Sequence, residues 1–592
     1  MPVKVGKTAG FCWGVRRAMD IVLDVANLQE DELYTVGPII HNHQVTEMLA
    51  SKRVSIREEF DASSPATAVV RTHGITPQKR RLLQEESVTL HDATCPYVLR
   101  IHGIIRKYQS RGWDIVIVGD RGHAEVNGLY GTSNERAYIV ESEAEADRLP
   151  PLTQVCIVAQ TTHNQQRFAR IVERVQKKAP TSEVFNTICD DTEERQSELA
   201  ALCEEVDAMV IIGGSHSANT ARLASIAQDS GRPTVKIETE ADLDASWVRR
   251  YGTIGVMAGA STPTWVIRNI VDALESLQQA SRSWTFRALH RLARLATASY
   301  GANAVGALCL AAAISIWLGA PISGPSLALA FCLIFSLLVL SHLAEGYDPE
   351  FDDPVRRSLF RHRLGLQGVA GAAAVAALLL ASPLGWQGGA WGSVGVVLIL
   401  FALGHVGHPQ RRGLRSLSRG RAKRAWGLVY RSLILGSAWW CAGSLLPWLA
   451  QRALAARAGV SLSIVPATST TFGLASLAAF GLPFLTALLL DLGDREADRI
   501  GGRPSLPILL GEVAGERLLH LGNAVILAAT AAGVAAGSLP AAALAVIAPL
   551  AALSALRLAQ RRRLYFSRST EEMLAAGVLP LFAAATLLAA VL

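Results

Sequence analysis

The apolar positions of this chain follow one pattern up to residue 280 and another from residue 299. In the first part, short apolar runs that end in glycine alternate with amphipathic segments. In the second part, the apolar segments are long and nearly free of charge. The first pattern is typical of a parallel α/β sheet, and the second is typical of membrane helices. We therefore expect an α/β domain over 1–280, a linker over 281–298 and an all-α membrane domain over 299–592.

Four apolar runs of the first part predict strands, at 67–74, 114–120, 208–214 and 254–261. Polar residues follow the ends of these strands, which is where parallel sheets bind ligands. The candidate binding residues are His73, His123, Glu125, Ser217, Asn219 and Ser261, with His41 in G-P-I-I-H-N and Thr161 in Q-T-T-H-N.

Three cysteines, Cys12, Cys95 and Cys189, share a local pattern, because each lies in a loop that begins a predicted helix. A helix N-terminus lowers the pKa of a thiol and stabilises the negative charge that a metal ligand carries. Three such thiolates can hold three corners of an iron–sulfur cluster and leave one iron open. Their number alone does not separate a cluster from a zinc ion. Apolar stretches surround the other five, which we expect to be packing residues: Cys156, Cys203, Cys309, Cys332 and Cys441.

Buried thiols or disulfides are the alternative for the three cysteines. The chain starts M-P-V-K-V-G-K, without a basic-then-apolar signal segment, so we expect this domain in a reducing cytoplasm. The unit of cysteine, helix and strand recurs about every ninety residues, so we expect a three-lobed fold around a central cluster.

Nine segments of the second part are long enough to cross, or nearly cross, a bilayer. The loops at 344–365, 408–428, 491–516 and 558–572 hold nearly all of the loop arginines, which places them and the first domain on the cytoplasmic side. We therefore expect a multi-pass protein of the cytoplasmic (inner) membrane. Its net charge of +7 reflects arginines in short loops of the second part, which we expect to face the anionic lipid bilayer and not nucleic acid. The nine segments are 300–319, 325–343, 366–383, 391–407, 429–450, 464–490, 517–536, 540–557 and 573–591.

The linker has an apolar face, with Trp284, Leu289, Leu292 and Leu295, opposite a face rich in arginine. This pattern predicts a helix that lies on a membrane surface, and a soluble amphipathic helix is the alternative.

Two acidic clusters lie at ends of predicted membrane helices, E-G-Y-D-P-E-F-D-D at 345–353 and D-L-G-D-R-E-A-D-R at 491–499. Carboxylates with this spacing can hold Mg²⁺ ions that bind a diphosphate, whereas solvated helix ends are the alternative.

Residues 1–275 resemble the 4-hydroxy-3-methylbut-2-enyl diphosphate reductase family, through the three cysteine strings, I-H-N, R-T-H-G, G-H-A-E-V-N-G, Q-T-T, G-G-S-H-S-A-N-T and A-G-A-S in the family's order. The resemblance implies that this domain converts that allylic diphosphate to isopentenyl and dimethylallyl diphosphate, the last step of the non-mevalonate isoprenoid pathway. It also implies an external electron donor such as ferredoxin or flavodoxin.

By the same resemblance, Cys12, Cys95 and Cys189 ligate a [4Fe–4S] cluster and Glu125 donates a proton. The implied substrate-binding residues are His41, His73, His123, Thr161, Ser217, Ala218, Asn219 and Ser261. Ala218 stands where the family usually has serine, which removes one hydroxyl that could contact the diphosphate.

Residues 300–592 resemble the UbiA-type intramembrane prenyltransferases. The resemblance implies a Mg²⁺-dependent transfer from a polyprenyl diphosphate to a lipid-soluble acceptor. Two alternatives stay open: an inert membrane anchor for the reductase, or a cluster-based sensor attached to an active transferase. The implied Mg²⁺ ligands are Glu345, Asp348 and Asp352 of the first motif, and Asp491, Asp494 and Asp498 of the second.

Overall fold

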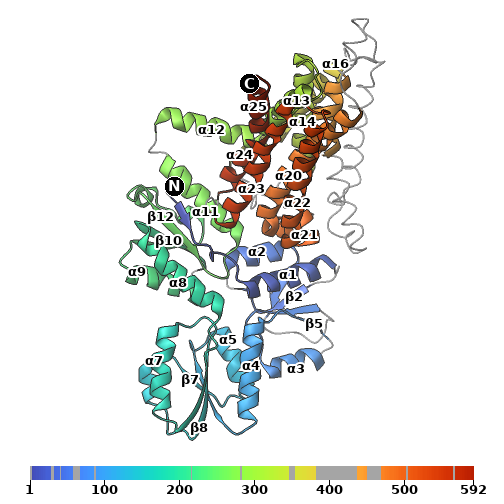
Figure 1. Cartoon of the computed structure of the whole chain (residues 1–592). Helices are drawn as coiled ribbons and strands as arrows, with labels where there is room; N and C mark the ends of the chain where they lie inside the picture. The colour runs from blue at the N-terminus through green and yellow to red at the C-terminus, as the bar shows by residue number, and fades with distance from the viewer. Residues whose placement is uncertain are drawn as a thin grey trace, which may run out of the picture. The chain divides into compact units, whose positions relative to one another are not determined.

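The computed structural model describes residues 3–28, 33–40, 42–57, 67–85, 88–214, 217–279, 283–345, 354–381, 436–449, 469–501, 505–563 and 567–591. The chain forms two compact units, Met1–Gln278 and Gln279–Leu592. Figure 1 shows the sheets and helices of the first unit in blue to green, and the helices of the second in green to red.

The first unit contains three four-stranded sheets, and every strand pair in them is parallel. Each sheet forms one lobe, so the predicted three-lobed α/β fold is confirmed. Lobe A has the order β1 (Val3–Val5), β12 (Ile254–Ala258), β10 (Ala208–Ile212) and β11 (Thr234–Ile237). Lobe B has the order β3 (Val54–Arg57), β2 (Leu33–Val36), β4 (Thr67–Val70) and β5 (Thr89–Asp92). Lobe C has the order β7 (Tyr138–Val140), β6 (Asp114–Val118), β8 (Gln154–Ala159) and β9 (Thr181–Phe185).

The inner strands of these sheets are continuous apolar runs because helices cover both of their faces. All five residues of β10 are buried, as are the last four of β6. The four predicted strands are confirmed as β4, β6, β10 and β12.

Most helices of the first unit connect consecutive strands, and α1, α4 and α8 lead from one lobe to the next. They are α1 (Trp13–Leu28), α2 (His43–Ser51), α3 (Pro77–Glu85), α4 (Pro96–Gln109), α5 (Ala124–Thr132), α6 (Glu143–Asp147), α7 (Gln165–Gln176), α8 (Asp190–Glu204), α9 (Ala218–Asp229), η1 (Glu240–Asp242), α10 (Ala245–Val248) and α11 (Thr264–Gln279).

The second unit contains helices and no strand among its described residues. Its helices are α12 (Trp284–Ala298), α13 (Gly301–Trp317), α14 (Gly324–Glu345), α15 (Pro354–Arg361), α16 (Arg363–Ala381), η5 (Cys441–Leu445), α20 (Ser469–Gly501), α21 (Leu506–Leu510), α22 (Glu512–Ala535), η7 (Ala541–Val546), α23 (Ile547–Arg561), α24 (Arg568–Ala576) and α25 (Val578–Val591).

Six helical stretches of the described residues are long and apolar enough to cross a membrane, or seven if α12 and α13 count as one bent span. Each of the six corresponds to one of the nine predicted segments. Of the others, 391–407 lies outside the described residues, and 429–450 is described only at 436–449. The count of nine therefore stays a prediction, supported so far for six or seven.

Small residues let the helices of the second unit approach one another closely. A Cβ added to Gly443 would stand 2.9 Å from Leu310 Cδ2 and 3.1 Å from Ala479 Cβ. Larger side chains fill the spaces beside them, as where the rings of Trp317 and Phe582 meet edge to face, 5.4 Å apart. The unit thus has its own packed core.

Candidate active site

The three predicted cysteines all lie at the starts of helices. Cys12 immediately precedes α1, and Cys95 and Cys189 are the N-cap residues of α4 and α8. The backbone N–H of Val15 donates to Cys12 Sγ at 3.4 Å, and backbone N–H groups of the first helical turn lower the pKa of the Cys95 and Cys189 thiols. All eight cysteines of the chain are free thiols, so the disulfide alternative fails in this structure.

Gly14 separates two of the cysteine sulfurs. A Cβ added to Gly14 would lie 2.7 Å from Cys95 Sγ and 3.9 Å from Cys12 Sγ, so the two sulfurs border the same small volume. Negative charge on Cys95 also raises the pKa of Cys12 and of Cys189, which places Cys95 near both.

Three thiols arranged in this way can hold an iron–sulfur cluster. In a cluster each cysteine binds a different iron, so the sulfurs surround the group instead of meeting at one point. Within the described residues, no three His, Cys, Asp or Glu side chains converge as the ligands of one metal ion do.

Burial reverses one expectation about these thiols. The backbone N–H groups lower the pKa of each, as predicted, but burial is the larger effect. It raises the pKa of Cys12 from 9.0 to about 11, and it also raises the pKa values of Cys95 and Cys189. Metal binding, which releases protons from its ligands, has to overcome this preference for the neutral thiol.

Each cysteine loop is fixed to the neighbouring strand-end loop of its own lobe by a backbone hydrogen bond. The N–H of Cys12 donates to Ala260 O at 3.2 Å, that of Cys95 to Thr72 O at 2.9 Å, and that of Cys189 to Thr161 O at 2.9 Å. These carbonyls belong to, or directly precede, candidate substrate-binding residues: Ser261, His73 and Thr161. The fold therefore places cysteine loops and candidate binding loops side by side in all three lobes.

Side chains from α8 hold the loop that precedes Cys12. The guanidinium of Arg195, which is 1 % exposed, donates to Thr8 O and, at 3.0 Å, to Ala258 O. Glu198 accepts from the N–H groups of Lys7 and Thr8 at 2.6 and 2.7 Å. The sequence analysis did not predict a role for either residue. A charged residue in an amphipathic helix can be buried and hydrogen-bonded or exposed to solvent, and the pattern does not distinguish the two.

An arginine of α1 makes a similar hydrogen bond to lobe B. Arg17 donates to Thr94 O at 3.2 Å, one residue before Cys95. The helices that begin at Cys12 and Cys189 thus each brace the loop of another cysteine.

Glu125 is buried, with 1 % of its surface exposed. Its Oε1 accepts from the backbone N–H of Thr161 and its Oε2 from the Thr161 hydroxyl, both at 2.7 Å. Burial raises the pKa of Glu125 from 4.5 to about 7, and the nearby charge of Asp120 acts in the same direction. This carboxyl can therefore carry a proton near neutral pH, as a general acid must.

Two candidate histidines lie together near the start of α5, and one of them, His123, is two residues from Glu125 in the sequence. His123 is the N-cap residue of α5, and its Nδ1 accepts from the N–H of Glu125 at 3.2 Å. Its other nitrogen, Nε2, therefore carries the proton of the neutral ring. The rings of His123 and His73 meet edge to face, 5.2 Å apart. The third candidate, His41, lies outside the described residues.

The start of α9 carries three further candidates. Ser217 is the N-cap residue, and its hydroxyl accepts from the N–H of Thr220 at 3.3 Å. Asn219 is 8 % exposed, and its Oδ1 has no hydrogen-bond partner among the described residues. Ala218 begins the helix, but its side chain lies outside the described residues. The last candidate, Ser261, follows β12 in the loop that binds the N–H of Cys12.

Arg222 of α9 and Gln160 hold the Thr161 loop in place, and the sequence analysis predicted neither. Arg222 donates to Thr162 O and lies 3.6 Å from Asp120 Oδ1. Gln160, which is fully buried, accepts from the N–H of Asp120 at 2.8 Å. Both residues lie in or beside the quoted strings, but only the folded chain reveals their partners.

The candidate Mg²⁺ ligands of the second unit are described only in part. Asp491, Asp494 and Asp498 lie at positions i, i+3 and i+7 near the end of α20, on one face of the helix. Asp494 also pairs with Arg568, Oδ2 to Nη2, at 3.1 Å. Asp348, Asp352 and the side chain of Glu345 lie outside the described residues. The Mg²⁺ site therefore stays a prediction.

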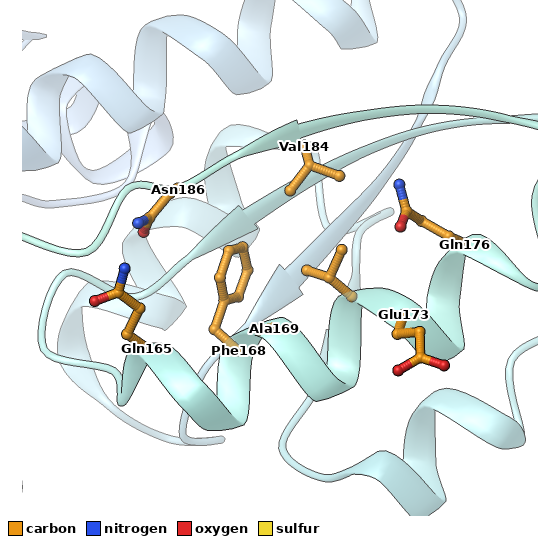
Figure 2. A pocket seen from close by; sticks show the side chains of 8 residues that line it. Gln165, Phe168, Ala169, Glu173, Gln176, Val184 and Asn186 are labelled. Carbon is orange, nitrogen blue, oxygen red and sulfur yellow. The ribbon is translucent and has the colours of Figure 1, made fainter.

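A pocket of about 300 Å³ lies on lobe C. Figure 2 shows Phe168 and Glu173 of α7 on one side of it, and Val184 and Asn186 on the other. No candidate site residue lines it.

Three parallel α/β lobes that bring three free thiols, a buried acid and a histidine pair to their strand ends define a class of α/β protein with a candidate iron–sulfur site. The family model described as LytB protein matches residues 3–275. It ends at residue 275, so the second unit lies outside it.

Curated relatives agree with this match. The 4-hydroxy-3-methylbut-2-enyl diphosphate reductase of Caldanaerobacter subterraneus is 39 % identical over 282 residues, which are 47 % of this chain and 98 % of the relative. The protein of the same name from Opitutus terrae is 41 % identical over 291 residues, or 47 % of this chain and 100 % of the relative. Through its first unit, the chain belongs to the LytB family.

A solved structure, titled as the E-1-hydroxy-2-methyl-but-2-enyl-4-diphosphate reductase from Plasmodium falciparum, is 29 % identical. The match covers 46 % of this chain and 86 % of that chain, with a TM-score of 0.44.

Proposed function

We propose that the first unit removes the hydroxyl group of 4-hydroxy-3-methylbut-2-enyl diphosphate and yields isopentenyl and dimethylallyl diphosphate. Full-length relatives of that name match this unit over almost their whole length. The observation that carries the proposal is the buried Glu125 carboxyl, with its raised pKa, in the same lobe as the loop of Cys189.

In this reaction one C–O bond breaks and one C–H bond forms, which requires two electrons and two protons and releases one water. A bound [4Fe–4S] cluster would supply the electrons singly and an open iron for the hydroxyl oxygen. Cys12, Cys95 and Cys189 are the residues that would hold it.

Glu125 and Thr161 supply the first proton in this proposal. A backbone N–H can only donate, so Oε1 of Glu125 accepts in both protonation states and the proton resides on Oε2. The Thr161 hydroxyl then accepts that proton and can donate its own onward. Thr161 thus connects the buried acid to the departing hydroxyl.

The diphosphate lies, in this proposal, among neutral donors at helix starts. The N-terminal turns of α5 and α9 offer backbone N–H groups and a favourable dipole to an anion. His123 Nε2 donates from the first, and Ser217 and Asn219 donate from the second. His41, His73 and Ser261 complete the predicted set.

The test is anaerobic reconstitution of the full chain with iron and sulfide, followed by assay with the hydroxylated diphosphate. Cys189→Ser should lose the distinct open-iron signal in the Mössbauer spectrum and all turnover. Cys203→Ser, at a buried cysteine of the same helix, should keep both. Stoichiometric zinc without iron in anaerobically purified wild-type protein would contradict the proposal.

We further propose that the second unit is embedded in the cytoplasmic membrane and transfers a prenyl group with Mg²⁺. The apolar helices and the three aspartates on one face of α20 support this proposal. Membranes with the whole chain should then transfer a polyprenyl group from its diphosphate to a lipid-soluble acceptor. Asp498→Asn should abolish the transfer and leave the reductase rate unchanged. If polyprenyl diphosphate does not bind in the presence of Mg²⁺, the unit is an anchor.

A further inference from the structure

The chain turns sharply between α12 and α13, within the second unit. The axes of the two helices differ by 80°. Tyr300 forms the corner with φ +62°, in the left-handed region that residues with a Cβ seldom adopt. Such a conformation persists only where the surrounding structure holds it.

Arg356 of α15 stabilises this conformation of Tyr300. It is 5 % exposed, its Nε donates to Ala298 O at 3.3 Å, and its guanidinium lies 5.0 Å from the centre of the Tyr300 ring. The guanidinium also binds both carboxylate oxygens of Glu572 on α24, at 3.2 and 2.7 Å. On the other side, the Tyr300 hydroxyl lies 3.1 Å from His342 Nδ1 of α14. Three helices thus fix the corner in one geometry.

The helix held by this corner presents its apolar residues outward. Trp284 is 71 % exposed, Leu289 69 %, Leu292 62 % and Leu295 44 %. At 100° per residue these four positions fall within one stripe along α12. An amphipathic helix of a soluble protein turns this face toward the core, so the soluble alternative does not account for the exposure.

We propose that α12 lies in the plane of the membrane, with this stripe among the acyl chains of phospholipids. Two observations favour lipid over a protein partner. First, α13 is apolar along its length, so if it runs along the membrane normal, the 80° corner lays α12 flat on the surface. Second, Arg291 is exposed beside the stripe, where a cation meets anionic headgroups. The inference rests on the proposed membrane placement of the second unit.

The test places the photocrosslinker p-benzoylphenylalanine in the full chain, in vesicles of phosphatidylethanolamine and phosphatidylglycerol. The label replaces Leu289 in one variant and Leu521 in another. Leu521 is a control for membrane placement, because it is 62 % exposed on α22, one of the six candidate spans. Native cysteines, and with them the cluster ligands, stay unchanged.

After irradiation, mass spectrometry identifies the adducts. We expect phospholipid adducts from both positions. A lipid adduct at 521 together with a peptide adduct at 289, from this chain or from a second copy, would overturn the inference. A lipid adduct at 521 with no adduct at 289 would also overturn it. In both cases the proposed membrane placement of the second unit stands. If position 521 gives no lipid adduct, the proposed membrane placement itself fails.

A second variant tests the corner. Arg356→Gln in the chain labelled at 289 should reduce the lipid adduct several-fold and leave the yield at 521 unchanged. An unchanged adduct at 289 would show that Arg356 does not hold the helix, and would overturn that part of the inference.

Discussion

Glu125 and Thr161 are joined by two hydrogen bonds of 2.7 Å, one from the backbone N–H and one from the hydroxyl of the threonine. The backbone N–H can only donate, so Oε1 always accepts. The proton of the neutral acid therefore lies on Oε2, where its hydrogen-bond partner is the Thr161 hydroxyl. One residue therefore both orients the acid and offers a path for its proton.

Thr161→Val should separate these two roles. Valine keeps the backbone N–H and the shape of the side chain but lacks the hydroxyl, so the acid stays in place without its relay. We expect kcat to fall by about 10²-fold, the low end for general acid catalysis, with iron content unchanged. Thr161→Ser is the matched control and should retain most of the wild-type kcat. Equal rates for the valine and serine variants would rule out the relay.

Glu125→Gln should lower turnover by at least about 10²-fold while substrate still binds, because glutamine cannot donate an acidic proton. In the wild type, kcat should fall as the pH rises through about 7, where Glu125 loses its proton. Turnover that remains in the glutamine variant should lack this limb. Stopped assays between pH 5 and 9 measure both effects, and an identical limb in the variant would assign it to another group.

The same pKa shift predicts how stability depends on pH. Folding raises the pKa of Glu125 from 4.5 to about 7, so the folded state binds more protons than the unfolded state across that interval. Stability therefore falls as the pH rises from 4.5 to 7 and is then constant, a loss on the order of 3 kcal/mol. Denaturant unfolding of wild type and Glu125→Gln should show this slope only in the wild type.

Gly14→Ala should damage the cluster site, because the new Cβ would stand 2.7 Å from Cys95 Sγ. We expect the purified protein to lose most of its iron and its visible absorbance. Gly103→Ala is the control: Gly103 lies exposed within α4 with nothing within 4 Å, so alanine should stabilise the helix by about 0.5–1 kcal/mol. Normal iron content in Gly14→Ala would show that Gly14 does not shape the site.

Arg195→Leu should destabilise the first unit and loosen the Cys12 loop, because it leaves Thr8 O and Ala258 O without a buried donor. A buried carbonyl that loses its hydrogen-bond donor costs about 1–3 kcal/mol. We expect a lower melting temperature and faster loss of iron in air. Arg174→Leu, at an exposed ion pair of 3.6 Å, should change neither. If the Arg195→Leu protein retains iron in air for as long as the wild type does, the hydrogen bonds of Arg195 do not position Cys12.

The sequence alone determined the elements that carry the site. Cysteines at helix starts, apolar runs that end in glycine and long uncharged segments are local patterns, and local backbone preferences act on them directly. The strands β4, β6, β10 and β12 and the helices that begin after Cys12, Cys95 and Cys189 therefore lie where the patterns predict.

The tertiary structure determined how deeply each residue is buried and which residues of different elements contact one another. Burial raised the pKa of Cys12 although its helix start lowers it, because desolvation depends on every neighbour of the sulfur and not on the local turn. The ties of Arg195 and Arg222 join residues that are 187 and 60 positions apart, a separation that no periodicity reveals. Likewise, the apolar face of α12 could be recognised in the sequence, but only the folded chain shows that this face is exposed and that α12 ends in a sharp corner at Tyr300.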